Sequence, residues 1–295
     1  MTRIALQDDF SQGLGSTWRR IACHGAGLQL TGEALRLVNT NASAQRYTNA
    51  QIDDYGGLAR RRFLWSPPLT LTVRARFSHP APRLRDECDC DFQYHPTAEA
   101  GPILGGTAGF GFWNDPFVMG GRRIPALPRA IWFFYASPPS NMKLDLRTPG
   151  CGWKAATIDA ARLPFLALAP TIPVAVPLMN LSAAYRRLWP IGQRAISVNE
   201  APVNADMTGW HTYVVEWGAT TARFWVDGQS VLDCITPPRG PLGLVIWLDN
   251  QFMVVTPQGR LRHGLLTKPG EQWMEIDSIQ IERPLGSAPN HSYLG

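Results

Sequence analysis

Short runs of alternating polar and apolar residues recur along this chain of 295 residues, and each run is bounded by Gly, Pro, Asn or Asp. In the run at residues 69–77, apolar side chains at positions 71, 73, 75 and 77 alternate with polar ones at 72, 74 and 76. Alternation with a period of two places one face of a strand in a core and the other in solvent. Many such runs between turn signals predict an all-β sandwich or barrel.

Further strands are expected at residues 58–65, 107–113, 130–136, 210–217, 221–226, 231–235, 243–248 and 273–282. The stretch from 163 to 190 departs from this pattern, because four prolines interrupt an apolar sequence before residues 181–189, which are expected to form a short helix. We therefore expect one domain over residues 1–283, with an insertion at 160–200 and a C-terminal tail at 284–295.

Composition favours one large core and argues against nucleic-acid binding and against a membrane span. Hydrophobic residues make up 45% of the chain and charged residues 17%, which is typical of a globular protein. The net charge of +5 comes mostly from arginines spread along the chain, so no basic stripe for nucleic acid is predicted. No apolar run reaches the roughly 18 residues that a membrane span needs.

The N-terminal residues lack the basic and then apolar pattern of a secretion signal. The five cysteines are an odd number without the spacing of a disulfide framework, which favours a reducing compartment. We expect a cytoplasmic protein, unless a signal has been removed. The sequence leaves the oligomeric state open.

Several motifs, taken in order, carry a family resemblance. They are Asp8-Asp9-Phe10 with Trp18, the strand at 71–77, Trp210 to Trp217, Arg223-Phe224-Trp225-Val226-Asp227-Gly228, and Met274 to Glu282. This ordered set resembles the concanavalin A-like lectin/glucanase superfamily, and within it the family 16 glycoside hydrolases. The resemblance implies a jelly-roll β-sandwich of two antiparallel sheets with a concave cleft.

The same resemblance implies a Glu-x-Asp-x-Glu motif on one cleft strand, and a retaining hydrolase needs its two catalytic carboxyl groups about 5 Å apart. The counterpart by position is residues 131–135, which contain no carboxylate. Glu275-Ile276-Asp277 is on the last strand and lacks a further acid at the required alternate position. The resemblance also implies a structural calcium ion, for which Asp9 and Asp277 would be the protein carboxylates, and no required cofactor.

The aromatic run at residues 130–136 replaces the expected acids. Trp132 and Phe134 would line the cleft on one parity, and Ile131, Phe133 and Tyr135 on the other. Aromatic rings stack on sugars and equally on terpenoid or polyketide skeletons. The alternative is a strand that is buried on both faces and contributes only packing.

Candidate site residues lie on three of the predicted strands or directly after them. Asp115 and Asp249 could divide acid and base roles if their surroundings separate their pKa values, and Tyr135 could donate a proton. The expected ligand-binding residues are Trp113, Asn114, Trp132, Phe134, Trp247 and Asn250. The alternative for Asp115 and Asp249 is that they are turn residues with local hydrogen bonds.

Two functions remain open beside a purely structural or partner-binding role. The first is a carbohydrate-binding or divergent carbohydrate-active protein without the standard retaining acid and nucleophile. The second is an intracellular enzyme that cyclises or isomerises an apolar small molecule in an aromatic cleft, where ring faces steady cationic character. The insertion is expected to be a lid over the cleft; contact of its apolar residues and Arg186-Arg187 with a membrane surface is the alternative.

Overall fold

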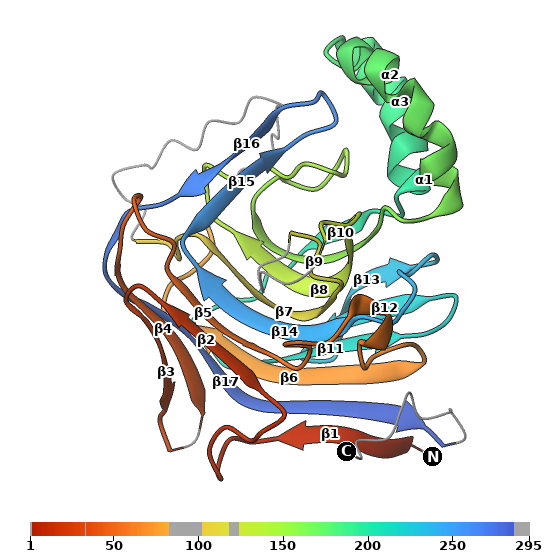
Figure 1. Cartoon of the computed structure of the whole chain (residues 1–295). Helices are drawn as coiled ribbons and strands as arrows, with labels where there is room; N and C mark the ends of the chain where they lie inside the picture. The colour runs from red at the N-terminus through yellow and green to blue at the C-terminus, as the bar shows by residue number, and fades with distance from the viewer. Residues whose placement is uncertain (1, 33, 83–101, 118–123, 286–295) are drawn as a thin grey trace.

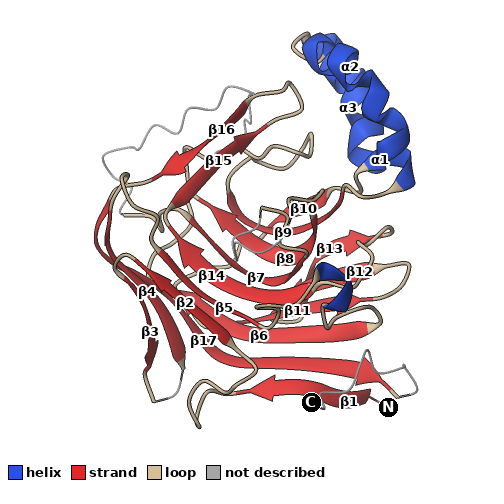
Figure 2. Cartoon of the chain, viewed as in Figure 1, coloured by secondary structure: helices blue, strands red, loops and turns tan. Residues whose placement is uncertain are grey.

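A computed structural model describes residues 2–32, 34–82, 102–117 and 124–285 (Figure 1). Most of the expected tail at 284–295 lies outside these residues. Two antiparallel sheets pack face to face (Figure 2), which confirms the prediction of an all-β sandwich.

The eight-stranded sheet has the order β13 (Gln229–Cys234), β12 (Ala222–Val226), β11 (His211–Trp217), β6 (Leu69–Phe77), β17 (Lys268–Pro284), β4 (Leu35–Ala42) and β3 (Ala26–Leu30), and β1 (Thr2–Asp8) also pairs with β17. The seven-stranded sheet has the order β10 (Asn199–Pro202), β9 (Gly152–Asp159), β8 (Arg129–Ala136), β7 (Thr107–Trp113), β14 (Gly243–Asp249), β5 (Asn49–Asp53) and β2 (Arg19–Cys23). A separate hairpin is formed by β15 (Gln251–Val255) and β16 (Leu261–Leu265).

The core lies between the two sheets and uses alternate residues of each strand. In β8, Ile131, Phe133 and Tyr135 are fully buried in this core, whereas Trp132 and Phe134 point to the other face of the sheet and are partly exposed. This settles the parity of the aromatic strand, and only one of its faces belongs to the core. The alternation continues in β7 and β14, so the outward face of the seven-stranded sheet carries Thr107, Trp113 and Trp247.

One predicted strand is wrong. Residues 58–65 contain a short 3-10 helix, Arg60–Arg62, and only an isolated bridge joins Trp65 to Leu242. Three successive arginines have no apolar side chain to alternate with, so the chain turns there. The Arg60 guanidinium donates to the backbone carbonyls of Asn114 and Asp115 and so ties this turn to the loop after β7.

The insertion forms a helical hairpin instead of one short helix. It contains α1 (Leu163–Leu168), the 3-10 helix η2 (Ala169–Thr171), α2 (Ile172–Leu178) and α3 (Ser182–Ala195). Prolines stand in the first turns of α1 and α2, where a missing backbone N–H costs no hydrogen bond. Pro177 lies inside α2 and Pro190 inside α3, so these two helices form despite an interior proline. No helix in the described part of the chain is long and apolar enough to cross a membrane.

Two glycines of β7 allow Trp247 of β14 and Trp132 of β8 to pack close to the β7 backbone. Gly109 pairs with Trp247 on one side, and Gly111 pairs with Trp132 on the other. A Cβ atom at position 109 would be 2.9 Å from the Trp247 ring, and one at position 111 would be 2.6 Å from the Trp132 Cβ. Both distances are shorter than van der Waals contact, so only glycine fits at these positions.

We therefore expect Gly111→Ala to lower the free energy of unfolding by about 1–3 kcal/mol, because the added methyl group overpacks the sheet. Urea denaturation followed by tryptophan fluorescence measures the change. Gly15→Ala is the matched control, since a Cβ atom there meets no atom within 4 Å. Equal stability of the two variants would contradict the close packing of Trp132 on β7.

Candidate functional site

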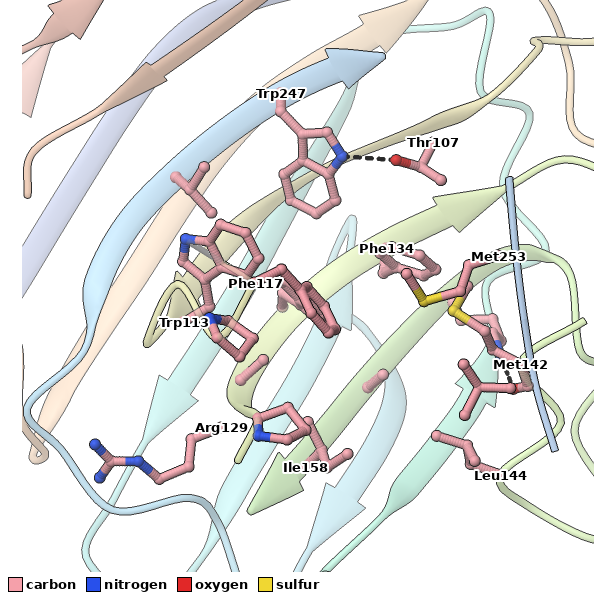
Figure 3. Close-up of a pocket in the computed structure, with 18 of the residues that line it drawn as sticks. Thr107, Trp113, Phe117, Arg129, Phe134, Met142, Leu144, Ile158, Trp247 and Met253 are labelled. Carbon is pink, nitrogen blue, oxygen red and sulfur yellow. Dashed lines mark hydrogen bonds between the residues drawn. The ribbon is translucent and has the colours of Figure 1, made fainter. Parts of the chain in front are cut away.

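A pocket of about 210 Å³ lies on the outward face of the seven-stranded sheet (Figure 3). Strands β7, β8, β9 and β14 form its floor, and β15 and the loop before β9 contribute to its walls. The lining side chains are mainly aromatic and aliphatic. The pocket is therefore an apolar site on the sheet face opposite the core.

Four aromatic rings form one continuous platform in the floor. Trp132 is stacked on Phe134, with centroids 5.3 Å apart, and lies 5.3 Å from Trp247 and 5.8 Å from Trp113. Trp113 and Trp247 are nearly parallel, with an interplanar angle of 8°. All four rings line the pocket, where the sequence had predicted ligand-binding residues.

Hydrogen bonds fix two of these indoles. Trp113 Nε1 donates to the Tyr55 hydroxyl at 2.7 Å, and Trp247 Nε1 donates to Thr107 Oγ1 at 2.9 Å (Figure 3). A fixed indole loses little freedom when a ligand stacks on it, which reduces the entropic cost of binding. The platform is thus preorganised.

Asp249 lines the pocket at the end of β14 and is buried. Its Oδ1 atom accepts hydrogen bonds from Thr107 Oγ1 at 2.8 Å and from Gln251 N at 3.0 Å, and its Oδ2 atom accepts one from the Tyr47 hydroxyl at 3.3 Å. Burial raises the pKa of this carboxyl to about 6, although the hydrogen bonds oppose the shift. Near neutral pH both protonation states of Asp249 are accessible.

A second buried carboxyl lies across the pocket. Glu200 Oε1 accepts from Lys154 Nζ at 3.1 Å, and the same ammonium donates to the Pro149 carbonyl at 3.1 Å. Both side chains are more than nine-tenths buried, and both line the pocket. Burial raises the pKa of Glu200, and the charge of Lys154 opposes this shift. Its Oε2 atom is buried without a hydrogen-bond partner.

The two carboxyls are too far apart for the standard glycosidase pair. Asp249 is on β14 and Glu200 on β10, four strands away in the same sheet. With about 4.8 Å between neighbouring strands, the separation is on the order of 20 Å. Retaining hydrolysis needs about 5 Å between the two groups, and inverting hydrolysis about 6.5–9.5 Å.

Three predicted site residues do not line the pocket. The Asn114 amide donates to the Leu127 carbonyl at 3.0 Å and accepts from Arg129 N at 2.9 Å, and Asp115 is fully buried beside it. Asn250 accepts from Thr48 N at 2.9 Å and donates to three carbonyls of the surrounding loops. Asn114 and Asn250 hold loops in place, as turn residues often do, and the loop after β7 reaches the pocket through Pro116 and Phe117.

Tyr135 is also displaced from its expected place. It lies in the core between the sheets, and its hydroxyl donates to the Leu104 carbonyl at 2.7 Å. Trp132 and Phe134 occupy the pocket face, so period-two alternation turns Tyr135 away from it. A buried tyrosine that has found a carbonyl partner is a packing residue.

The calcium site implied by Asp9 and Asp277 does not fit the structure. Asp277 forms an ion pair with Arg74, with 3.2 Å between Nη1 and Oδ1, so a cation already faces this carboxylate. Asp9 accepts hydrogen bonds from the backbone and hydroxyl of Ser11. Among the described residues, no group of three or more His, Cys, Asp and Glu side chains is placed to hold a metal ion.

Tyr47, Lys154 and Glu200 line the pocket but were not predicted from the sequence. The sequence contains a sign that Lys154 is unusual: it is one of only three lysines in the chain, and it lies in the largely apolar run Gly152–Asp159. A lysine inside a buried strand requires a partner. Its partner Glu200 lies beyond the helical insertion, and only the pairing of β9 with β10 brings the two together.

Structural comparison finds relatives of the fold. An endo-β-galactosidase from Clostridium perfringens, which releases GlcNAcα1-4Gal, has a TM-score of 0.54 at 12% identity, over 96% of this chain and 62% of that chain. The Crh5 transglycosylase in complex with NAG has a TM-score of 0.48 at 12% identity, over 98% of this chain and 87% of that one. A β-glucanase from Bacillus licheniformis has a TM-score of 0.47 at 10% identity, over 95% of this chain and 98% of that one.

No family model and no curated protein matches the sequence. The structural neighbours are glycoside hydrolase-like jelly-roll proteins, and the likeness to the endo-β-galactosidase confirms the expected jelly-roll fold. At 12% identity, this likeness concerns the fold alone.

The raised pKa of Asp249 makes stability depend on pH. The native carboxyl has a pKa of about 6 against an ordinary value of 3.8, so the folded state binds this proton more tightly than the unfolded state. The free energy of unfolding should therefore fall as pH rises from about 4 to about 6. Asp249→Asn should remove this part of the fall, on the order of 3 kcal/mol.

Urea unfolding of both proteins across this pH range tests the expectation. Asp233→Asn is the matched control, because the Asp233 side chain is 70% exposed and forms only a loose pair with Arg223. A pH profile of Asp249→Asn that coincides with the wild-type profile would show that Asp249 has an ordinary pKa.

Proposed function

We propose that the protein binds an apolar, ring-containing small molecule in this pocket and transfers a proton on it through Asp249, in an isomerisation or cyclisation. The observation that carries the proposal is the platform of Trp113, Trp132, Phe134 and Trp247 with a buried carboxyl at its edge whose pKa is raised to about 6. Aliphatic walls from β15 and the loop before β9, including Met142, Leu144 and Met253, extend the apolar surface (Figure 3).

At the Asp249 end of the pocket, hydrogen bonding within the protein favours an apolar ligand over a sugar. Thr107 Oγ1 is shared between Asp249 and Trp247, and the Gln51 amide donates to Asp53 at 3.0 Å. The Tyr47 hydroxyl donates to Asp249. A sugar hydroxyl that leaves water needs new partners, and each unmet bond costs about 1–3 kcal/mol. An apolar ring has no such need.

The placement of Asp249 supports a catalytic role. A carboxyl with a pKa of about 6 can give or take a proton near neutral pH, which suits general acid–base catalysis. Positive charge that develops on a substrate would be stabilised by the faces of Trp132 and Trp247. The neighbouring positions Ala130, Trp132 and Phe134 of β8 offer no second carboxyl, which argues against glycoside hydrolysis.

Glycan binding is the second candidate, and one specific observation favours it. Trp132 and Phe134 are partly exposed and stacked, with an interplanar angle of 23°, so they present a flat surface of the kind on which a sugar ring can lie. In this case the protein would bind a glycan, as the glycoside hydrolase-like structural neighbours do, but without a pair of catalytic carboxyl groups.

Mass spectrometry of the protein isolated from its native host under non-denaturing conditions should show a bound apolar molecule. Quenching of tryptophan fluorescence by that molecule measures its affinity. We expect Trp132→Ala to weaken binding about 10-fold or more, because stacked rings contribute roughly 1.5 kcal/mol beyond their buried area. Trp273→Ala is the matched control, since Trp273 lies on the other sheet and stacks with Arg36.

Asp249→Asn separates binding from chemistry. The amide keeps the size of the side chain and its bonds to Thr107 but cannot transfer the proton, so turnover should fall about 100-fold or more while affinity is retained. Calorimetric titration against β-glucans and galactans tests the competing function. Heat of binding to a glycan that is lost in Trp132→Ala, with no apolar ligand found, would overturn the proposal in favour of glycan binding.

A further inference from the structure

Positive charge is concentrated in two segments that flank the pocket. Residues 160–199 and 250–270 contain Arg162, Arg186, Arg187, Arg194, Arg260, Arg262 and Lys268. They hold seven of the 28 basic residues and none of the 23 acidic residues, so the rest of the chain has 21 basic and 23 acidic residues. The net positive charge of the protein therefore belongs to these two segments.

Most residues of each segment form a hairpin, and the tips of the two hairpins meet, whereas Lys268 is the first residue of β17. The helical hairpin of α1, α2 and α3 rises from one side of the sandwich, and the β15–β16 hairpin rises from the other (Figure 1). The Asn180 amide, between α2 and α3, donates to the Gln258 carbonyl at 3.3 Å. A Cβ atom at Gly259 would be 2.6 Å from the Val176 side chain, so the tips are in close contact.

Large apolar side chains are exposed at these joined tips. Val174 is 66% exposed, Leu178 45% and Leu181 64% on the helical side, and Leu261 is 77% exposed on the strand side. We call these four residues the apolar tip. Exposed apolar residues that gather next to cations are typical of interaction surfaces.

The geometry of the tip points to a lipid surface as its partner. Arg186 follows Leu181 by five residues of helix, which places its Cα about 8 Å further along the axis. Proteins that lie on a membrane bury apolar residues about 5–10 Å deep, at the level where arginine side chains meet the headgroups. Arg186 and Arg187 are exposed, and none of the ion pairs seen among the described residues includes them.

We propose that the two joined hairpins bind the surface of a membrane rich in anionic lipids, with the apolar tip inserted and the arginines on the headgroups. Each arginine near such a surface contributes to attraction, and the absence of acidic residues removes repulsion. A protein partner with an acidic rim would need a shaped apolar socket, whereas a bilayer accepts the irregular tip without one. The proposal is independent of what the pocket binds.

This placement would bring the pocket to the membrane. Val198 follows α3 and lines the pocket, and β15 contributes Met253 and Val255 to its wall. Leu144, Ile158 and Val198 also pack with the base of the helical hairpin. An apolar surface thus continues from the hairpin into the pocket, which would let an apolar ligand pass between lipid and protein.

Sedimentation with vesicles of phosphatidylcholine, alone or in an equal mixture with phosphatidylglycerol, tests the proposal. We expect binding to the mixed vesicles, weakened by added salt, and little binding to phosphatidylcholine alone. Leu178→Glu with Leu181→Glu should abolish binding. Arg186→Gln with Arg187→Gln should weaken it about 30-fold, because each arginine contributes a factor of about five.

Ile235→Glu is the matched control, because Ile235 is 80% exposed but belongs to neither hairpin. Unchanged thermal unfolding of each variant establishes that the fold is intact. The proposal is overturned if the wild-type protein ignores anionic vesicles, or if the Leu178 and Leu181 variant binds them as the wild type does. A third result would also overturn the proposal: light scattering that shows a dimer for the wild-type protein and a monomer for the Leu178 and Leu181 variant. A second copy of the chain would then cover the apolar tip.

Discussion

The close packing of β7 against its neighbouring strands at two glycines is the constraint on which the pocket depends. Gly109 and Gly111 have no side chains on the outward face of β7, so Trp247 and Trp132 can lean over this strand from both sides. Their rings then come within 5.3 Å of each other above the backbone. Any larger residue on β7 would separate the rings and leave two isolated aromatic side chains in place of a continuous platform.

The platform also determines the chemistry that remains open to the site. Aromatic rings occupy the outward positions 132 and 134 of β8, and the two carboxyls that line the pocket among the described residues are four strands apart. Both are buried and hydrogen-bonded within the protein, and burial raises the pKa of both. Separate carboxyls with raised pKa values suit single proton transfers better than the concerted work of a pair.

Period-two alternation made the fold and half of the site predictable. The strand at residues 107–113 was predicted with its observed bounds, and Trp132 and Phe134 belong to one of the two parities that the sequence left open for their strand. Trp247 and Asp249 lie at the end of the strand that was predicted at 243–248. Asn114 and Tyr135 lie outside the pocket lining, because alternation is lost in a loop and because two parities fit an apolar strand equally well. Glu200 was out of reach, since its partner Lys154 lies 46 residues earlier, across the helical insertion.

The helical hairpin shows why local sequence rules failed where the pocket meets its surroundings. Four prolines suggested an irregular lid, yet prolines in first turns allow α1 and α2 to form. Within the insertion at 160–200, Val198 and Glu200 line the pocket, whereas the residues of α1, α2 and α3 do not. The helical hairpin contacts the β15–β16 hairpin beside the pocket. The surface that the two hairpins share carries apolar side chains and basic residues without acidic ones. A lid that only covered a ligand would not require Val174, Leu178 and Leu181 to be exposed to water. Burial of these three side chains against a partner would lower the free energy, because it removes apolar surface from water.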